Sequence, residues 1–343
     1  MGSVKDLKIV ADTTKSNMGI GRFYFSDRYS VFDWGEMPDE IPRKGEAIAI
    51  LSAYFFERFK NEGILTHYEG LIEESCVKQL KDVKKPINII EVKLLNIIKP
   101  VFKSGTYDYS AYKFAKHSFL IPLEIIYRNE LPKGSSVFKR LENGTITLQE
   151  LNIDEKPLQG HKFKDPFIDY STKFEITDRY LNRNEAMECA GLTELQIQKI
   201  EEQTLKISKI ISEEFSKIGF VNQDGKVEYG FDLNRSLMLV DVAGTLDECR
   251  FSYNGIQISK EIARTYYRNT AWHLETERAK NEDRENWKAI CKLQPEPLPP
   301  KLKILISNIY CAVTNEITNK KWFENIPSLK ELKFELESMP QQK

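Results

Sequence analysis

Three side chains in the stretch from Gly219 to Arg250 have types and spacing that could do chemistry on phosphates. Lys226, Glu228 and Asp241 would bring two carboxylates and one ammonium group together if they share one face of a sheet. Magnesium prefers hard oxygen ligands and usually shares them with phosphates, so this set suits a magnesium-bound polyphosphate. A half-solvated hairpin with a surface charge cluster explains the same residues, and the pattern alone does not decide between the two.

A hairpin is the element that would position these residues. Two strand-like runs, 226–231 and 236–242, flank a turn at 232–235. With Leu233 and Asn234 at the centre of the turn, Lys226 lies opposite Asp241, and Glu228 opposite Leu239. Side chains alternate between faces along a strand, so the three charged residues would share one face. The other face would carry the apolar residues Val227, Tyr229, Met238 and Val240.

Four other segments add groups that could bind phosphate. Lys5 follows a glycine in a short segment before a strand, and Lys173 lies in an exposed polar run. Arg128 ends a buried strand and is followed by residues 134–136 (GSS), and an arginine fork with hydroxyls and glycine amides binds phosphate well. Arg250 could bind an anion or pair with Asp247. Each segment alone favours a structural role. Together they predict a phosphate-binding set of Lys5, Arg128, Lys173, Lys226 and Arg250.

Composition and charge exclude several classes of protein. The 343 residues are 41% hydrophobic and 29% charged, which is typical of a soluble protein with room for two lobes. A formal net charge of -1 gives no electrostatic case for nucleic acid or an anionic membrane. The five cysteines form no CxxC pair and no apolar run reaches the length of a membrane span. These features predict a cytoplasmic protein with reduced thiols.

The four histidines, at 67, 117, 161 and 273, do not suggest a site. None lies near a serine or cysteine in a nucleophile-elbow pattern, and none has a cysteine at metal-ligand spacing. Ser-His-Asp chemistry and a zinc site are therefore not expected.

Hydrophobic patterning predicts alternating strands and helices. The clearest helix is 193–218, in which Thr193 and Gln196 fit a capping box and Gly219 fits a C-terminal stop. Residues 96–117 lack periodicity and are interpreted as an insertion, residues 129–140 as a loop, and 295–300 as a stiff linker. The remaining strands are expected at 7–10, 21–25, 87–95 and 119–127, and the remaining helices at 46–61, 259–268, 274–292 and 301–318.

Five motifs in order resemble those of one known family, the phosphoribosylaminoimidazole-succinocarboxamide synthases (SAICAR synthetases) of purine biosynthesis. Residues 2–7 (GSVKDL) resemble the family's G-K-V-R-D-[IV] loop, and residues 27–33 (DRYSVFD) with 41–45 (IPRKG) resemble D-R-I-S-A-F-D and I-P-x-K-G. Residues 120–128 (LIPLEIIYR) with Gly134 resemble a third signature. Residues 224–230 (DGKVEYG) resemble D-x-K-x-E-[FI]-G, and Asp241, Asp247 and Arg250 resemble D-E-x-x-x-D-x-S-R. The resemblance covers about residues 1–268.

The resemblance implies an α+β fold of two lobes with ATP in the cleft between them. Residues 1–93 would form an antiparallel, β-rich ATP-binding lobe. Residues 94–343 would form a larger lobe with the substrate and magnesium sites and a C-terminal helical extension. The implied reaction joins L-aspartate to the carboxylate of carboxyaminoimidazole ribonucleotide, with ATP and Mg²⁺ as cofactors. The expected partners are these small molecules and a second copy of the chain in a homo-oligomer, without nucleic acid or membrane.

The resemblance also assigns roles to residues. Lys5 would lie over the ATP phosphates, with Lys173 as a further cation, and the backbone of Ile90, Val92 and Lys93 would read adenine. Glu228 and Asp241 would hold magnesium. The residues implied for catalysis are Lys5, Asp224 and Lys226, and those implied for substrate binding are Asp33, Arg128, Ser135, Ser136, Asp247 and Arg250.

Several positions depart from the family pattern. Ser3 replaces a lysine, Gln223 takes an apolar position, and Val242 stands where a second acid is usual. The loop after Arg128 is one residue longer, so either Ser135 or Ser136 could be the ligand. The 96–117 insertion and the tail after 268 resemble a longer archaeal branch. A small-molecule kinase on the same fold and a non-catalytic nucleotide-binding relative are the alternatives.

Overall fold

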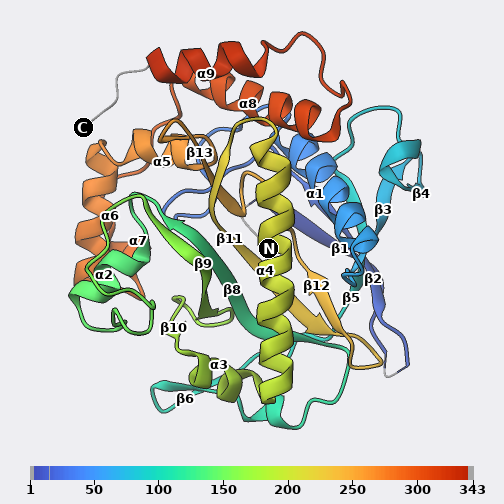
Figure 1. The fold of residues 1–343 in the computed structure, drawn as a ribbon, viewed down its shortest axis with the longest axis vertical. Helices are drawn as coiled ribbons and strands as arrows, with labels where there is room; N and C mark the ends of the chain where they lie inside the picture. Colours follow the sequence, from blue (N-terminus) through green and yellow to red (C-terminus); the bar gives the residue numbers. More distant parts are fainter. Residues whose placement is uncertain (1–3, 15, 339–343) are drawn as a thin grey trace.

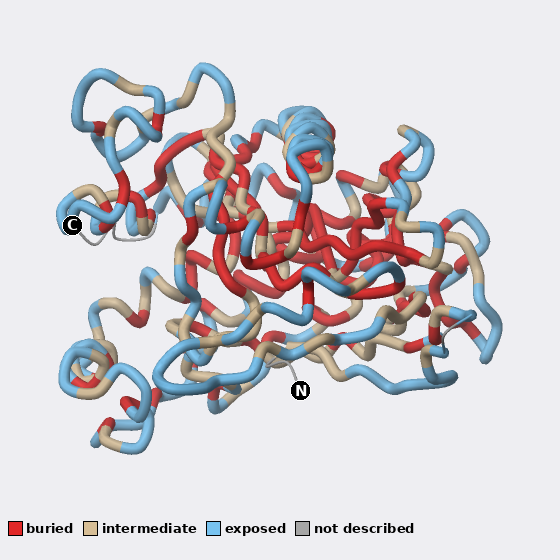
Figure 2. The backbone as a smooth tube through the Cα atoms, turned by 90° about the horizontal axis from the view of Figure 1, so that it is seen from below, coloured by how far each residue is buried: buried red, intermediate tan, exposed pale blue. Residues whose placement is uncertain are grey.

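The computed structural model describes residues 4–14 and 16–338, so Gly2 and Ser3 of the first motif lie outside the described residues. It contains two larger antiparallel sheets with helices packed on them (Figure 1), which confirms the expected α+β class. Buried backbone is concentrated in the centre of the molecule (Figure 2). Among the described residues, no helix has both the length and the apolar character that crossing a membrane requires.

The first sheet has five strands in the order β1-β2-β5-β3-β4. Helix α1 (Lys44–Asn61) packs against it and begins where the carboxylate of Asp27 accepts hydrogen bonds from the backbone N–H groups of Arg43 and Gly45 at 3.0 and 2.9 Å. Strands β3 and β4 were not predicted. The bounds are β1 (Lys5–Ala11), β2 (Gly19–Phe25), β3 (Tyr68–Glu73), β4 (Cys76–Lys78) and β5 (Ile89–Leu94).

The second sheet has seven strands in the order β10-β9-β8-β11-β13-β14, with β12 also paired to β11. Helix α4 (Glu194–Ser216) packs against β11 and crosses the sheet in Figure 1. Its predicted capping box, Thr193 with Gln196, is confirmed. The bounds are β8 (Phe119–Leu131), β9 (His161–Thr172), β10 (Tyr180–Leu181), β11 (Val221–Phe231), β12 (Leu237–Val240), β13 (Cys249–Tyr253) and β14 (Ile256–Gln257).

The central hairpin, β11 and β12, is shifted by one residue from the predicted register. Glu228 pairs with Val240, not with Leu239. The carboxylate of Asp232 accepts from the N–H groups of Asn234 and Ser236 at 2.8 and 2.7 Å, and Arg235 adopts a left-handed φ of 59°. The loop thus has three residues, 233–235, instead of two. Directly paired residues share a face, so Val240 and Met238 lie on the face of Glu228 and not with Val227 and Tyr229.

The loops depart from the prediction in two places. Strand β8 continues to Leu131, and residues Ser136–Glu142 form helix α2 with Ser135 as its N-cap, so 129–140 is not a single loop. The 96–117 segment contains a small hairpin of β6 (Val101–Lys103) and β7 (Thr106–Asp108), followed by a 3-10 turn at Ser110–Lys113. A second 3-10 turn covers Leu80–Asp82, and α3 (Arg183–Ala190) precedes α4.

The C-terminal helices bring the end of the chain back to its beginning. Helix α8 (Pro300–Thr318) packs on α1, and its Ser307 hydroxyl donates to the Pro42 carbonyl at 2.6 Å. Strands β1–β5 span Lys5–Leu94, one residue past the boundary expected for the first lobe, and α1 packs against α8 of the expected C-terminal extension. The other helices are α5 (Glu261–Tyr267), α6 (Ala271–Glu282), α7 (Trp287–Ile290) and the unpredicted α9 (Leu329–Ser338).

Candidate active site

Lys226 of β11 lies among three carboxylates. Its Nζ is 2.8 Å from Glu124 Oε1, 3.0 Å from Glu228 Oε1 and 3.6 Å from Glu248 Oε2. Glu124 comes from β8, directly opposite Glu228 in the sheet. Burial alone would lower the pKa of Lys226, but Glu248, Glu228 and Glu124 outweigh it and raise that pKa well above its usual value. Lys226 is therefore a fixed cation near the middle of β11.

Asp241 reaches the same cluster by leaving the strand. It follows the last residue of β12 and has a φ of 61°, a left-handed conformation that turns its side chain away from the ladder. The ammonium group of Lys5, from β1, forms an ion pair with it. Burial would raise the pKa of Asp241, but Lys5, Lys226 and Lys173 outweigh that effect and hold it well below its usual range. The predicted juxtaposition is thus present, although the predicted pairing with Lys226 is wrong.

His67 supports the backbone at Asp241. Its Nε2 lies 3.0 Å from the Asp241 carbonyl oxygen, and its ring lies between Phe23 and Phe56. Burial lowers the pKa of His67 to about 4, so the ring is neutral at pH 7 and donates to that carbonyl. The segment before β3 thereby links the two sheets at the site. Sequence patterns gave no signal for this role.

Lys173 completes a connected cluster of charges. Its Nζ lies 2.5 Å from Glu228 Oε2, and the Glu228 side chain is only 2% exposed. Burial would lower the pKa of Lys173, while Glu228 and Asp241 raise it more. The structure therefore brings together Lys5, Lys173, Lys226, Glu228 and Asp241, which we call the lysine–carboxylate cluster.

The cluster fits a metal that arrives with phosphates better than a resident metal. Among residues 4–14 and 16–338, no group of three or more histidine, cysteine or acidic side chains has metal-site geometry. Glu228 and Asp241 are two oxygen donors, each paired to lysine. Magnesium is commonly held by one or two carboxylates and completes its shell with phosphate oxygens and water. The donor set therefore suits a magnesium–polyphosphate complex. Its phosphate oxygens would also replace the carboxylates as ion-pair partners of the lysines.

A polar cleft of about 430 Å³ adjoins Lys226. The predicted residues Asp33, Lys226 and Asp247 line it, together with Lys44, Glu124 and Lys260. Asp33 is at its open side, with a side chain that is 90% exposed. In the described part of the chain the Lys260 ammonium forms no hydrogen bond or ion pair, and burial together with Arg264 lowers its pKa. The cleft wall therefore carries a cation that would be stabilised by an anionic ligand.

Asp247 lies at the other end of the cleft. Its Oδ2 is 2.6 Å from Lys44 Nζ, and its Oδ1 accepts from the Tyr310 hydroxyl at 2.6 Å. Burial would raise the pKa of Asp247, but Lys44 and Lys260 outweigh it and lower that pKa. Asp247 does not pair with Arg250, which was one of the two expected alternatives for that arginine. Tyr310 lies in the tail, where no motif pointed to it.

The predicted arginines belong to a separate network. Arg128 donates to Asp169 through Nε and Nη2 at 3.1 and 2.8 Å, and its Nη1 lies 3.4 Å from Asp224. Arg250 forms a two-pronged ion pair with the same Asp224, and Arg140 lies 2.6 Å from Asp169. None of these five residues, which we call the arginine network, lines the cleft. The carboxylates of Asp169 and Asp224 already occupy the guanidinium groups that were predicted to bind phosphate.

Of the two serines after Arg128, Ser136 contacts this network. Ser136 accepts from Arg128 Nη2 at 3.2 Å and donates to Tyr180 at 2.8 Å, while Ser135 caps α2. Helix α5 lies between the 134–136 loop and the cleft. Its Glu261 pairs at 2.5 Å with Arg264, which lines the cleft, and at 2.9 Å with Arg268. A Cβ at Gly134 would lie 3.1 Å from the Arg268 guanidinium, so this loop and α5 are neighbours.

The backbone of β5 does not support the predicted contact with adenine. Strand β5 is central and pairs with β2 on one side and β3 on the other, and the Lys93 N–H donates to the His67 carbonyl at 2.8 Å. Ile90 and Val92 are buried, and Lys93 forms an ion pair with Glu69 at 2.9 Å. Because their N–H and C=O groups serve the sheet, they are not available to read a base.

An exposed apolar surface lies beside Lys5 instead. Leu7 and Ile9 are 47% and 56% exposed and lie on the same face of β1 as Lys5. A Cβ at Gly21 would come within 2.8 Å of both Leu7 and Leu94, so these leucines meet over that glycine. Large exposed apolar side chains grouped in this way mark ligand surfaces. The sequence pattern predicts β1 only as a strand, because the alternation of its side chains does not show which face other residues cover.

Two departures from the family pattern have simple structural explanations. Gln223 is buried and its amide is satisfied by Glu130 at 2.6 Å and Gln257 at 2.7 Å. Val242 is 4% exposed and belongs to the hydrophobic core. An apolar residue at 242 is therefore well accommodated.

Comparison with known proteins identifies the family. A sequence model of SAICAR synthetase matches residues 8–282. A curated relative from Archaeoglobus fulgidus, named as a phosphoribosylaminoimidazole-succinocarboxamide synthase, is 44% identical over 339 residues and covers 99% of both chains. The synthase of Thermoplasma acidophilum is 30% identical and covers 94% of this chain and 98% of its own.

Solved structures show the same fold. A SAICAR synthetase (type 2) in complex with ADP has a TM-score of 0.56 at 22% identity, covering 87% of this chain and 99% of that one. The SAICAR synthase of Saccharomyces cerevisiae, complexed with SAICAR, has a TM-score of 0.61 at 20% identity, covering 92% and 96%. With a family match over most of its length and a relative 44% identical across 99% of both sequences, the chain belongs to the SAICAR synthetase family.

Proposed function

We propose that the chain catalyses ATP-dependent formation of an amide between L-aspartate and the carboxylate of carboxyaminoimidazole ribonucleotide. The observation that carries this proposal is the lysine–carboxylate cluster at the edge of a polar cleft. Two acids, Glu228 and Asp241, and three ammonium groups converge there from β1, from β11, and from the residues directly after β9 and β12. Family membership, shown by the sequence comparisons, names the reaction.

ATP would lie across the cluster. A solved family structure is described as an ADP complex, which supports nucleotide binding on this fold. The triphosphate would be bound by Lys5, Lys173 and Lys226, and the adenine would pack on the exposed Leu7 and Ile9. Magnesium bound with ATP between Glu228 and Asp241 would neutralise phosphate charge.

The chemistry needs an activated carboxylate, because a carboxylate carbon is weakly electrophilic and its oxygen leaves poorly. Transfer of the γ-phosphoryl group to a carboxylate oxygen breaks the bond between the γ phosphorus and the bridging oxygen and releases ADP. The aspartate amine then attacks the acyl carbon, loses a proton, and inorganic phosphate leaves with the electrons of the C–O bond. The side chains of the cluster contribute mainly by holding the reactants and balancing charge.

The anionic substrates would occupy the cleft. Lys260 and Arg264 are cations on its wall, and the Arg264 Nε is buried without a hydrogen-bond partner in the described part of the chain. Aspartate carries two carboxylates, so these groups are the proposed contacts for it. The ribonucleotide phosphate would lie toward residues 134–136, near Arg128, Arg250 and Arg268. A cytoplasmic location and a homo-oligomeric state stay predictions.

A substrate-omission assay tests the proposal. ADP release is measured with the complete mixture and with aspartate or the ribonucleotide left out. We expect ADP only when both are present, together with magnesium. ADP release that does not depend on aspartate would favour a kinase, and nucleotide binding without any ADP release would favour a non-catalytic relative.

A further inference from the structure

The C-terminal helix α8 forms part of the wall of the cleft. Ile306 and Tyr310, both on α8, line it together with residues from the family-matched part of the chain. Helix α8 spans Pro300–Thr318 and so lies wholly beyond residues 8–282, the part that the family model matches. The tail therefore contributes side chains to a cleft whose other lining residues, except Val4, come from the family-matched part of the chain.

Tyr310 contacts the carboxylate that the motifs assign to substrate binding. Asp247 accepts one hydrogen bond from Tyr310 at 2.6 Å and one from Lys44 at 2.6 Å, one on each oxygen. All three side chains are largely withdrawn from solvent, with whole-residue exposures of 2% for Tyr310, 9% for Asp247 and 1% for Lys44. An ionised carboxylate has about four acceptor positions, so two remain for donors in the cleft.

The tyrosine is a donor in this contact at every physiological pH. Burial and the neighbouring Asp247 raise the pKa of Tyr310 well above its usual value, so its hydroxyl stays protonated. The same hydrogen bond, together with Lys44, helps to keep Asp247 ionised against the effect of burial. Tyr310 thus fixes both the orientation and the charge state of Asp247.

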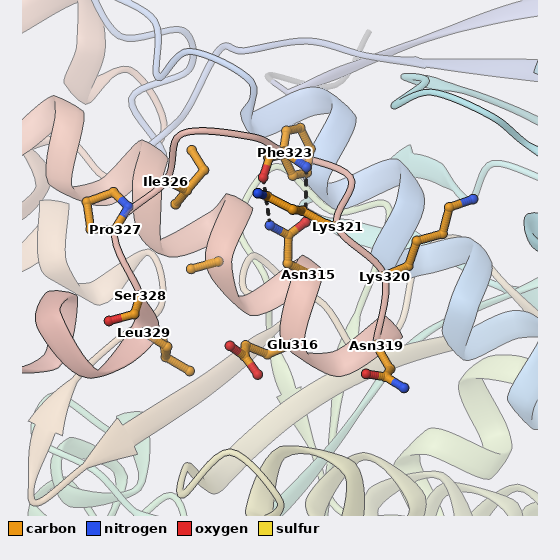
Figure 3. Close-up of a pocket in the computed structure, with 11 residues that line it drawn as sticks. Asn315, Glu316, Asn319, Lys320, Lys321, Phe323, Ile326, Pro327, Ser328 and Leu329 are labelled. Atoms are coloured by element: carbon orange, nitrogen blue, oxygen red, sulfur yellow. Dashed lines mark hydrogen bonds between the residues drawn. The ribbon is translucent and has the colours of Figure 1, made fainter.

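Helix α8 is held firmly enough to serve this purpose. Thr314 donates to the Ala47 carbonyl of α1 at 3.2 Å, and α8 packs along α1. At the far end, Asn315 accepts from the Phe323 N–H at 3.1 Å and donates to the Phe323 carbonyl at 2.9 Å (Figure 3). Because α1 also carries Lys44, both partners of Asp247 are set by the packing of α8 on α1.

We propose that Tyr310 is a positioning residue for Asp247 and that the C-terminal helix α8 is therefore a working part of the substrate cleft. This inference rests on the proposed function. Its ligand is the ribonucleotide, whose ring amine and ribose hydroxyls are the donors that a fixed carboxylate would accept. Tyr310 would act on the substrate through its hydrogen bond to Asp247.

The test compares Tyr310→Phe with Ser307→Ala. Both remove one hydroxyl from α8 and one hydrogen bond of 2.6 Å, but the Ser307 bond faces Pro42 and not the cleft. For Tyr310→Phe we expect the KM for the ribonucleotide to rise about ten-fold, with little change in the KM for ATP. We also expect the acidic limb of the kcat/KM profile to move to higher pH, because Asp247 loses a group that lowers its pKa. Ser307→Ala should leave both unchanged.

An unchanged KM and acidic limb in Tyr310→Phe, or equal effects from Ser307→Ala, would overturn the positioning role while the proposed function stands. Thermal unfolding of both variants checks that they are folded. Absence of aspartate-dependent ADP release in the unmodified chain would overturn the proposed function instead. Calorimetric titration with the ribonucleotide then tests the role of Tyr310 without any turnover. A higher Kd for the ribonucleotide in Tyr310→Phe than in the unmodified chain supports the inference, and an equal Kd rejects it.

Discussion

The lysine–carboxylate cluster and the arginine network are both buried sets of opposite charges, yet they are built differently. In the cluster the cations are lysines, and 18–26% of each lysine side chain is exposed to solvent. In the arginine network, Arg128 and Asp169 are 2% and 1% exposed, and planar guanidinium groups engage both carboxylates. Lysine is a point charge on a flexible stem, whereas arginine forms rigid two-pronged pairs. The cluster can exchange partners with an incoming ligand, whereas each guanidinium group of the network already has a buried carboxylate partner that a substrate phosphate would have to share.

This contrast shows that charges predicted to bind phosphate together need not share a role. Arg128 and Glu228, from two different motifs, were both expected to serve phosphate chemistry, but their surroundings separate them. The carboxylates of the cluster are paired with flexible, partly exposed lysines. Those carboxylates can therefore bind magnesium, and the lysines can bind phosphate. The Arg128 guanidinium group lies between two buried carboxylates, so its main role is structural. Any contact that it makes with a substrate phosphate must be shared with Asp169 and Asp224.

The largest expected effect is on the cluster. Glu228→Gln removes a charge that would hold magnesium while keeping shape, so kcat/KM should fall at least about 10³-fold, or about 4 kcal/mol, with little loss of stability. Steady-state ADP release measures kcat/KM, and thermal unfolding measures stability. Glu69→Gln, in an exposed lysine pair, is the matched control. Normal activity in Glu228→Gln would remove the metal assignment.

The opposite result is expected in the arginine network. Asp169→Asn leaves Arg128 and Arg140 without their shared buried counter-charge, so the free energy of unfolding should fall by about 3 kcal/mol. Denaturant titration measures it, and Asp165→Asn on the exposed part of β9 should change little. If Asp169→Asn were as stable as the control but inactive, the network would be a functional site and the contrast would fail.

A third prediction concerns the neutral His67 beside Asp241. In the folded chain its pKa is about 4, whereas an unfolded histidine titrates near about 6.5. The unfolded state therefore takes up a proton first, and stability should fall as the pH drops from about 6.5 to about 4, by at most about 3 kcal/mol. His67→Gln should flatten this slope in pH-dependent denaturant titrations. His117→Gln, on the surface, should leave it intact.

The smallest effect is expected at the apolar surface beside Lys5. Leu7→Gln should raise the KM for ATP about five-fold, which corresponds to about 1 kcal/mol of lost apolar contact. Val10→Gln is the control, because Val10 is 50% exposed on the other face of β1. Equal KM values for ATP in both variants would place adenine elsewhere. The test sharpens the comparison by asking how far the ligand surface extends from the cluster.

The sequence by itself determined the family, the α+β class and the residues of the cluster. Local signals were sufficient where chemistry is local: the capping box of Thr193 and Gln196 and the end of the helix shortly before Gly219 both appear in the structure. Ordered motifs also identified Glu228 and Asp241, because the residue types needed for phosphate chemistry are few.

Tertiary structure alone decided how those residues meet. A three-residue turn at 233–235 shifted the hairpin by one position, and only the left-handed φ of Asp241 returned its carboxylate to the cluster. Pairing on both sides of β5 removed its backbone from the candidate adenine site, and Asp169, far from Arg128 in sequence, closed the arginine network. Packing of α8 on α1 brought Tyr310 to Asp247. Apart from the turn at 233–235 and the backbone conformation of Asp241, these contacts join residues far apart in the chain, and local sequence patterns carry no information about them.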